Sequence, residues 1–384
     1  MKKLLFIAAI AGAALAACTK NDVVPSASEQ QEITFANPVS HVVTKVDLVP
    51  TTYPTGSSFS VFADYHKDPY ATAKASASNF TAYMRGTEGV DVTHSTTVIG
   101  TTPNIYNSYW VSAKPYYWPK DGYLTVAAYS PADTKNDATI EYDVTKGVQI
   151  TDYVVKSDLT NQRDLMLSNR EVDETSAEMV IDNPDPYDGV QLTFNHVLSA
   201  IKFTVVTDID YSTEANGQYT ITLKSLKIKN AYSTGDLTQF KDINELTIDM
   251  ETETTPESIW SNVDTENTDG YAISVPAPGT LSAEETTFSD SDDADLVLLP
   301  QLLDHTSASG GKVTAEVVYT VYHADMGDVS NAIEYTASLD LSQGSATATW
   351  DAGKRYIYNI KIGMDKVIFA PKVTAWDTQT EIKL

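Results

Sequence analysis

The chain has 384 residues, a formal net charge of −26 and a hydrophobic fraction of 42%. This length is sufficient for two domains, and the hydrophobic fraction is ordinary for a globular protein. The excess of acid argues against nucleic acid as a partner, because phosphates attract Lys and Arg side chains, and against adsorption to anionic lipid head groups. The 22 tyrosines, together with many threonines and valines, favour strands over helices.

The first residues have the pattern of a bacterial export signal. Lys2 and Lys3 precede a short apolar run that ends in Leu15-Ala16-Ala17-Cys18. This run is too short to span a bilayer, which requires about 20 residues. The sequence Leu-Ala-Ala-Cys resembles the bacterial lipobox, in which the cysteine thiol receives a diacylglycerol group and becomes the new N-terminus. The alternative is an ordinary signal peptide that ends in a cysteine by chance.

We therefore predict a signal peptide over residues 1–17 and lipidation of Cys18, the only cysteine in the chain. Acyl chains such as palmitate would then hold the mature protein at a membrane outside the cytoplasm. Residues 18–31 are polar and are expected to form a flexible tether behind the lipid. Alternating apolar residues from Ile33 to Val43 predict a first strand, which Pro38 weakens.

Short apolar or alternating segments, separated by turn residues, predict many further strands. They are residues 58–63, 123–129, 164–167, 219–223, 226–230, 271–275, 296–300, 313–322, 335–341, 347–350 and 355–362. Residues 190–206 form one apolar run in which the buried parity switches, and this pattern predicts a bulge. No convincing amphipathic helix longer than a few turns is evident, so we expect an all-β protein.

A segment rich in Pro, Asp and Gly between residues 181 and 189 is typical of a boundary between domains. We predict an N-terminal β-sandwich domain over residues 32–188 and a C-terminal one over residues 189–384. Each half of the chain would then form one sandwich.

The sequence lacks the motifs of common enzyme classes. There is no GxSxG, HExxH or GxGxxG motif, and Gly310-Gly311-Lys312 lacks the spacing of a phosphate-binding loop. His196 lies within an apolar run and is better explained as a hydrogen-bonded core residue than as a catalytic one. We therefore predict no enzymatic activity, no cofactor and no metal centre.

Two segments keep a binding function open. The acidic patch at residues 290–295 could hold Ca²⁺ through several carboxylates, although it lacks the glycine and terminal Glu of a calcium loop, so a solvated loop is the default. An aromatic cluster could form a platform on which a glycan stacks, although sandwich core is the more common role of such residues. Its members are Tyr106, Tyr109, Trp110, Tyr116, Tyr117 and Trp118.

Several short motifs carry a resemblance through their order and spacing. They are the lipobox at Cys18, Ile33-Thr34-Phe35, Thr44-Lys45, residues 56–63 of the form GxxFxVFA, and residues 117–122, 129–131, 192–200, 350–358 and 373–376. With these motifs the chain resembles the fimbrillin-like lipoproteins, a family that includes structural and accessory subunits of type V pili. The resemblance covers nearly the whole length of the chain.

The resemblance implies two tandem transthyretin-like Greek-key β-sandwich domains. It also implies that a surface protease cuts the loop after the first strand, here between Lys45 and Val46, where the family usually has an arginine. The loss of that strand leaves a groove, which the C-terminal tail of another subunit fills. Here the candidate donor tail is 367–384, with the apolar residues Val367, Phe369, Val373 and Trp376.

The expected partners are accordingly other fimbrial subunits, the outer membrane through the lipid anchor, and host or bacterial surface ligands. The expected location is a fimbrium on the cell surface. Two alternatives remain open. The tail could form ordinary terminal strands of its own domain, and the protein could be a monomeric surface lipoprotein that binds glycans.

Overall fold

The computed structural model describes residues 32–40, 53–95, 109–176, 189–248, 259–275, 279–283, 286–288, 296–305, 311–343, 348–364 and 367–375. These residues form strands and turns almost throughout, so the all-β prediction is confirmed. In the described part of the chain, the one α-helix, α1 (Tyr70–Ala73), is four residues long. The short 3₁₀ helices are Ala77–Asn79, Ala132–Asn136, Leu159–Asn161, Glu214–Asn216, Ala324–Met326 and Val329–Asn331.

The largest sheet has nine strands and is built mainly from the first half of the chain. Its hydrogen-bonded order is β1-β11-β9-β6-β2-β4-β5, with β3 paired to β2 and β10 paired to β6. The strands are β1 (Val39–Ser40), β2 (Ser58–His66), β3 (Phe80–Met84), β4 (Val90–Ser95), β5 (Tyr109–Ser112), β6 (Tyr123–Ser130), β9 (Met166–Ser168), β10 (Glu171–Glu174) and β11 (Thr193–His196).

Three further sheets belong to the second half of the chain. Their orders are β17-β12-β23-β24 with β18 paired to β12, then β16-β13-β20-β21, and the pair β19-β22. The strands are β12 (Ser199–Thr207), β13 (Tyr219–Lys229), β16 (Tyr271–Ile273), β17 (Thr286–Phe288), β18 (Leu296–Leu298), β19 (Gln301–Leu302), β20 (Thr314–His323), β21 (Ile333–Asp340), β22 (Thr349–Trp350), β23 (Lys354–Ile362) and β24 (Val367–Ala375).

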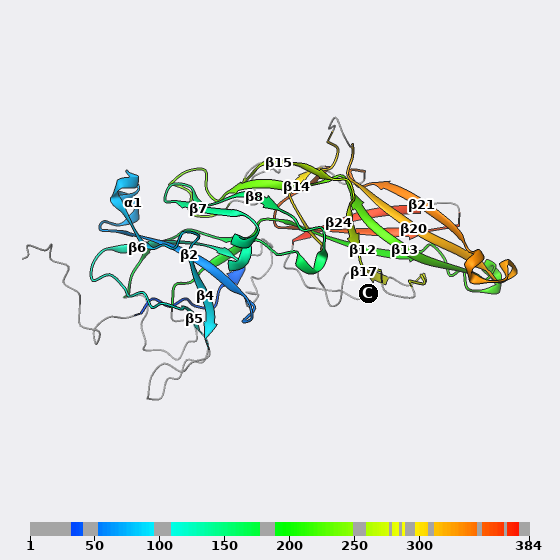
Figure 1. Cartoon of the computed structure of the whole chain (residues 1–384), viewed down its shortest axis with the longest axis horizontal. Helices are drawn as coiled ribbons and strands as arrows, with labels where there is room; N and C mark the ends of the chain where they lie inside the picture. The colour runs from blue at the N-terminus through cyan, green and yellow to red at the C-terminus, as the bar shows by residue number, and fades with distance from the viewer. Residues whose placement is uncertain are drawn as a thin grey trace, which may run out of the picture.

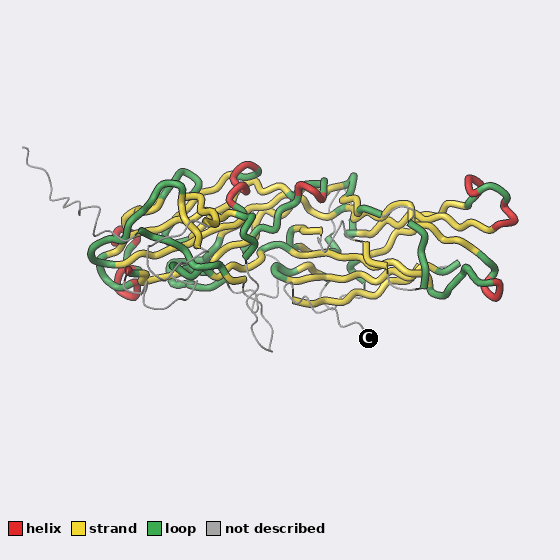
Figure 2. Tube along the Cα trace, turned by 90° about the horizontal axis from the view of Figure 1, so that it is seen from below, coloured by secondary structure: helices red, strands yellow, loops and turns green. Residues whose placement is uncertain are grey.

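One sheet joins the two halves of the chain. Its order is β15-β14-β8-β7, with β7 (Thr139–Asp143) and β8 (Gly147–Val154) from the first half and β14 (Ala231–Thr238) and β15 (Trp260–Asn267) from the second. In Figure 1 it lies along one side of an elongated molecule, between β2, β4, β5 and β6 at one end and β12, β13, β20 and β21 at the other. Figure 2 shows most strands running along the long axis.

Strand pairing also crosses the expected domain boundary at a second place. β11 follows residue 188, yet it pairs antiparallel with β9, with Phe194 opposite Ser168. At least two strand pairings, β8 with β14 and β9 with β11, connect residues 32–188 to residues 189–384. The division into two domains stays a prediction.

The apolar run over residues 190–206 differs from the predicted bulged strand. It forms two strands, β11 and β12, which belong to different sheets. Val197 and Leu198 link them and are fully buried. The carbonyl of Val197 accepts a hydrogen bond from the Trp260 indole at 2.6 Å, and that of Leu198 accepts one from the Gly353 N–H at 2.8 Å. The switch in parity marks the point where the chain passes from one sheet to the next.

Candidate functional site

The first described segment, residues 32–40, lies between two strands and bonds to both. On one side Phe35 N–H donates to the carbonyl of Trp110 at 2.9 Å, and Trp110 N–H donates back at 3.1 Å. On the other side Ala36 N–H donates to the Val190 carbonyl at 3.1 Å, and Val190 N–H donates to the Thr34 carbonyl at 2.9 Å. The segment is antiparallel to β5 and parallel to the stretch that leads into β11.

This position closes the large sheet on itself. β5 is one end of the hydrogen-bonded path, and β1, which belongs to residues 32–40, is the other end. Further bonds run from Ile33 N–H to the Tyr116 carbonyl at 2.8 Å and from Val39 N–H to the Leu192 carbonyl at 3.1 Å. Residues 32–40 thus complete a ring of strands, and their removal would leave two unpaired edges.

The side chains of this segment anchor it in the core. Ile33, Phe35 and Ala36 are at most 1% exposed. The Phe35 ring packs edge to face against Phe59, with 5.7 Å between the ring centroids. Burial of one such aromatic side chain contributes about 1.5–3 kcal/mol, so Phe35 is the main apolar anchor.

The rings around Phe35 form an aromatic cluster of their own. Phe59 lies 5.4 Å from Trp110 and 5.6 Å from Phe194, measured between ring centroids, and Tyr53 stacks on Phe194 at 5.7 Å. These residues come from segments far apart in the sequence. The pocket that holds Phe35 is therefore a product of the tertiary fold and would persist as an apolar trough if the segment left.

The absence of a side chain at Gly189 allows the backbone of the segment to pack closely against it. A Cβ placed on Gly189 would lie 2.5 Å from the Ala36 backbone nitrogen and 2.6 Å from the Phe35 carbonyl carbon. Real Cβ atoms do not approach backbone so closely, so glycine is required here by close packing. The breaker-rich stretch assigned to a domain boundary thus ends in a residue that contacts the first segment.

Polar contacts hold the outer end of the segment. The Trp110 indole N–H donates to Asn37 Oδ1 at 3.3 Å, and the Gln191 amide donates to the Asn37 carbonyl at 3.0 Å. Ser40 is the last described residue of this stretch. The predicted processing residues Lys45 and Val46, and the predicted lipidation site Cys18, lie outside the described residues.

The candidate donor tail begins in β24, at the edge of a sheet. β24 pairs antiparallel with β23, from Ile362 opposite Val367 to Lys354 opposite Ala375. β23 pairs on its other side with β12, whereas β24 has no second strand neighbour among the described residues. Val367, Phe369 and Val373 belong to this edge strand, and Trp376 lies outside the described residues.

The other sequence candidates do not form a binding site in the described structure. His196 is 8% exposed, and its Nδ1 lies 2.9 Å from an oxygen of Asp164, as expected for a satisfied core histidine. Trp110 and Trp118 are buried in the core rather than arranged as a platform for glycans. Tyr106 and the acidic patch at residues 290–295 lie outside the described residues.

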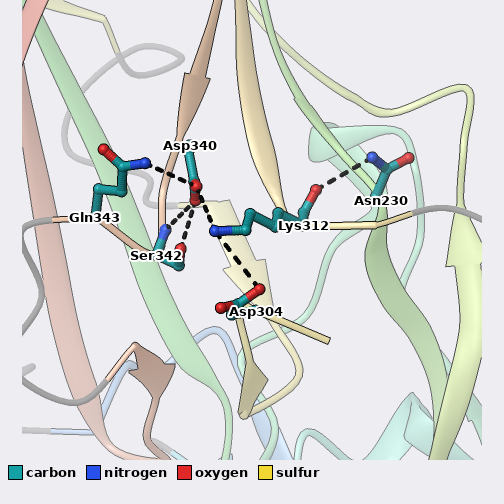
Figure 3. A network of polar contacts seen from close by, with 6 residues as sticks. All are labelled: Asn230, Asp304, Lys312, Asp340, Ser342 and Gln343. Atoms are coloured by element: carbon teal, nitrogen blue, oxygen red, sulfur yellow. Dashed lines mark hydrogen bonds and ion pairs between the residues drawn. The ribbon is translucent and has the colours of Figure 1, made fainter. Parts of the chain in front are cut away.

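A polar network in the second half fastens strand ends together (Figure 3). Lys312 Nζ lies 2.9 Å from Asp340 and 3.6 Å from Asp304, and Ser342 N–H donates to Asp340 at 3.0 Å. Burial raises the pKa of Asp340, but the hydrogen bonds from Ser342 and Lys312 outweigh it, so the net shift is downward. Lys312 thus bridges two carboxylates, and such paired and hydrogen-bonded groups are typical of a structural contact.

Two carboxyl groups in the first half are withdrawn from water to different degrees, since Asp64 is buried and Glu171 is half-buried. Asp64, 1% exposed, accepts a hydrogen bond from Arg85 at 2.6 Å. Burial raises the pKa of Glu171 to about 7. Among the described residues, no three His, Cys, Asp or Glu side chains form a group that could hold a metal ion. No helix in the described part of the chain is long and apolar enough to cross a membrane.

Residues 55–376 match the model of the fimbrillin-like family. The chain belongs to the fimbrillin-like family. This match covers most of the chain and confirms the resemblance seen in its motifs. The matched stretch begins at residue 55, after residues 32–40, which close the ring of strands.

Two solved structures of fimbrial proteins are similar to this chain. A fimbrial protein from Bacteroides vulgatus is 17% identical, with 90% of this chain and 100% of that chain covered and a TM-score of 0.53. The tip fimbrial protein Mfa3 from Porphyromonas gingivalis is 10% identical, with 90% and 100% covered and a TM-score of 0.36. The first of these indicates a shared fold. No curated protein sequence matches this fimbrillin-like chain.

Proposed function

We propose that this fimbrillin-like protein is a subunit of surface fimbriae, exported as an outer-membrane lipoprotein and assembled by strand exchange after a proteolytic cut. The observation that carries the proposal is the position of residues 32–40. They close a ring of strands, although the rest of that ring is formed by residues 58–196. A single cut in residues 41–52 would separate this strand from the body of the protein.

The cut would create a strong acceptor site. Loss of residues 32–40 leaves the Val190 N–H and the carbonyl groups of Val190 and Trp110 without their partners. Once the segment has left, these groups face water, and an incoming strand would replace the water with backbone hydrogen bonds worth about 0.5–1.5 kcal/mol each. The loss of residues 32–40 also uncovers the pocket of Phe35 and the aromatic rings around that pocket. An extended segment that restores both the hydrogen bonds and the apolar contacts would bind there by β-augmentation.

The donor in this proposal is the tail 367–384 of another subunit. Its first part, β24, already has the extended conformation required by the slot, which is the gap that residues 32–40 would leave. Among the described residues, β24 lies at a sheet edge with β23 as its strand neighbour. Donation would move β24 from a position bonded on one side to a position bonded on two sides. The gain in backbone hydrogen bonds and buried apolar surface would drive assembly.

The order of the proposed sites along the chain couples anchoring to assembly. Cys18 precedes residues 32–40, and the proposed cut between Lys45 and Val46 follows them. The same cut would therefore open the slot and separate the subunit body from its lipid. Export as a lipoprotein would keep each subunit at the outer membrane in a closed form until the protease acts.

Family membership and the fimbrial relatives support this role. The Bacteroides vulgatus structure is described as a fimbrial protein and Mfa3 as a tip fimbrial protein. The proposed function is structural and non-enzymatic, with other fimbrial subunits as partners and adhesion to host or bacterial surfaces as the outcome. The buried positions of Trp110 and Trp118 disfavour the alternative of a monomeric glycan binder.

The proposal is tested by treating the full chain with a trypsin-like protease and following its size by gel filtration and on denaturing gels. We expect the untreated chain to stay monomeric and the treated chain to form a ladder. Lys45→Gln should prevent the ladder, whereas Lys361→Gln, a change within β23, should not. A treated chain that is cut at Lys45 and stays monomeric would contradict strand exchange.

The lipoprotein part has a separate test. Mass spectrometry of the mature N-terminus should find acylated Cys18 as the first residue, and Cys18→Ala should abolish acylation. An unmodified terminus at another residue would contradict the anchor but not the exchange of strands.

A further inference from the structure

The first segment and the C-terminal tail share a sequence pattern. Residues 33–39 read Ile-Thr-Phe-Ala-Asn-Pro-Val, and residues 367–373 read Val-Ile-Phe-Ala-Pro-Lys-Val. Aligned on Phe35 and Phe369, the two stretches have the same residue at three of these positions: the phenylalanine, the alanine that follows it, and the last valine. The first position is a β-branched aliphatic residue in both.

We propose that the slot is filled by the tail of a second copy of this chain in one register, with Phe369 in the pocket of Phe35. The inference depends on the proposed strand exchange and adds to it the identity of the donor and its alignment. The donated strand would run in the same direction as residues 32–40, antiparallel to β5 and parallel to β11.

The side chains fit in this register. Phe369 would restore the edge-to-face contact that Phe35 makes with Phe59. Ala370 would take the place of Ala36, a small side chain that is 1% exposed. Val367 and Val373 would replace Ile33 and Val39, and both exchanges nearly conserve shape and volume.

The backbone fits as well. The N–H groups that bind the segment to its neighbours belong to Ile33, Phe35, Ala36 and Val39. Among the described residues, the Asn37 N–H donates no backbone hydrogen bond. Pro371, which has no N–H, aligns with Asn37 and so leaves every one of these bonds possible.

Registers shifted by two residues would each lose one of these backbone hydrogen bonds. A shift in one direction places Pro371 at the position of Val39, and a shift in the other places it at Phe35. Both positions donate a backbone hydrogen bond, at 3.1 Å and 2.9 Å respectively. Either shift would lose a bond that the native segment makes and would remove Phe369 from the aromatic pocket.

Registers shifted by one residue also fail. One shift places Phe369 at Ala36, where a large ring would replace a small side chain that is 1% exposed. The other places Pro371 at Ala36, whose N–H donates to Val190 at 3.1 Å. Of these five registers, the one that pairs Phe369 with Phe35 keeps both the ring in its pocket and the backbone N–H hydrogen bonds of the segment.

The alignment departs from the native segment at positions 34, 37 and 38. Ile368 replaces Thr34, which is 8% exposed, and so removes its hydroxyl. Pro371 replaces Asn37, so the Trp110 indole would lose the acceptor it has at 3.3 Å. Lys372 replaces Pro38, which is buried, so the lysine stem would have to pack against the body while its ammonium reaches water. The donated strand should therefore bind less well than the native segment at these three positions.

A chimera of the full chain tests the register without any need for assembly. Ile33→Val, Thr34→Ile, Asn37→Pro and Pro38→Lys together copy residues 367–373 into the slot. We expect a cooperative unfolding transition with Tm lowered by at most about 5 °C. A control chimera copies residues 369–375 into the same positions and so places proline at position 35; its Tm should fall by about 15 °C or more. Equal loss in both chimeras would overturn the register.

Disulfide trapping tests the donor. Val39 lies opposite Thr193, and Val373 takes the place of Val39. In a Cys18→Ser background, which removes the only native thiol, Val373→Cys with Thr193→Cys should give a disulfide-linked ladder after the protease cut. The matched pair Ala375→Cys with Thr193→Cys should not.

The outcomes separate the two proposals. A ladder linked through positions 375 and 193 would overturn the register alone. Subunits that assemble only after another fimbrial protein is added would overturn the second copy as donor. If the protease-treated chain forms no oligomer with either pair, both the strand exchange and the donated register are overturned.

Discussion

Gly189 packs so closely on Ala36 that a Cβ at position 189 would lie 2.5 Å from the Ala36 backbone nitrogen. This contact joins two segments that are far apart in the sequence. It fixes the depth at which residues 32–40 lie in the slot, because the neighbouring Val190 bonds to both Thr34 and Ala36. The slot is therefore sensitive to a single added methyl group.

Gly189→Ala should destabilise the full chain by about 1–3 kcal/mol, because the methyl group displaces backbone rather than a flexible side chain. Thermal unfolding should show the loss, and the proposed cut at Lys45 should become faster. Gly56→Ala is the matched control, since a Cβ there meets nothing within 4 Å. Equal effects of the two changes would contradict the tight contact.

Phe35→Ala should cost about 3–5 kcal/mol, because it removes a fully buried aromatic side chain and leaves a cavity beside Phe59. Chemical denaturation of the uncut chain measures the loss. Val39→Ala, at a half-buried position of the same segment, should cost clearly less. If Phe35→Ala were as mild as Val39→Ala, Phe35 would not be the anchor of the segment.

The Asp64–Arg85 pair supports the same sheet from inside. Arg85→Met should destabilise the protein by about 3 kcal/mol, because it leaves the carboxylate of Asp64 buried without its counter-charge. The loss should shrink as the pH falls, since a protonated Asp64 carries no charge. Lys135→Met breaks a more exposed pair with Asp91 at a similar distance of 2.7 Å, and should cost at most about 1 kcal/mol.

Glu171 gives the protein a pH dependence of defined sign. Burial raises its pKa from 4.5 to about 7, so the folded protein keeps a proton that the unfolded chain has released in this range. Stability should therefore fall as the pH rises from about 4.5 to about 7 and stay reduced above it, by at most about 3 kcal/mol.

Glu171→Gln tests this sign. The substitution should raise the free energy of unfolding at pH 8 and change it little at pH 4, measured by urea denaturation at both values. Glu141→Gln, at an exposed position of β7, should change neither. A Glu171→Gln variant that is less stable at pH 8 than the parent would show that the carboxylate is stabilised rather than penalised.

Strands with one buried face could be predicted from the sequence. Residues 58–63 and 123–129 alternate or run apolar, and they form the start of β2 and most of β6. β15 was missed because its residues are mostly polar and exposed, with Trp260 as its fully buried side chain. It is held by pairing with β14, and pairing between distant segments leaves little trace in local sequence.

The slot could be predicted only in part. Alternation of apolar residues indicated a strand over Ile33 to Val43, but the described segment makes short bridges on two sides rather than one regular ladder. The roles of Gly189 and Trp110 depend on what packs against them. Sequence alone placed Gly189 at a domain boundary and left Trp110 open as a glycan platform.

The mass of the subunits within assembled fibres tests the central claim most directly. If residues 32–40 leave the slot and a donated tail replaces them, every internal subunit should begin at Val46 and end at Leu384, and no peptide covering residues 32–40 should remain in washed fibres. Intact-mass and peptide mass spectrometry measure both. Assembled subunits that retain residues 32–40 would contradict the account, because the slot would still be filled by its own strand.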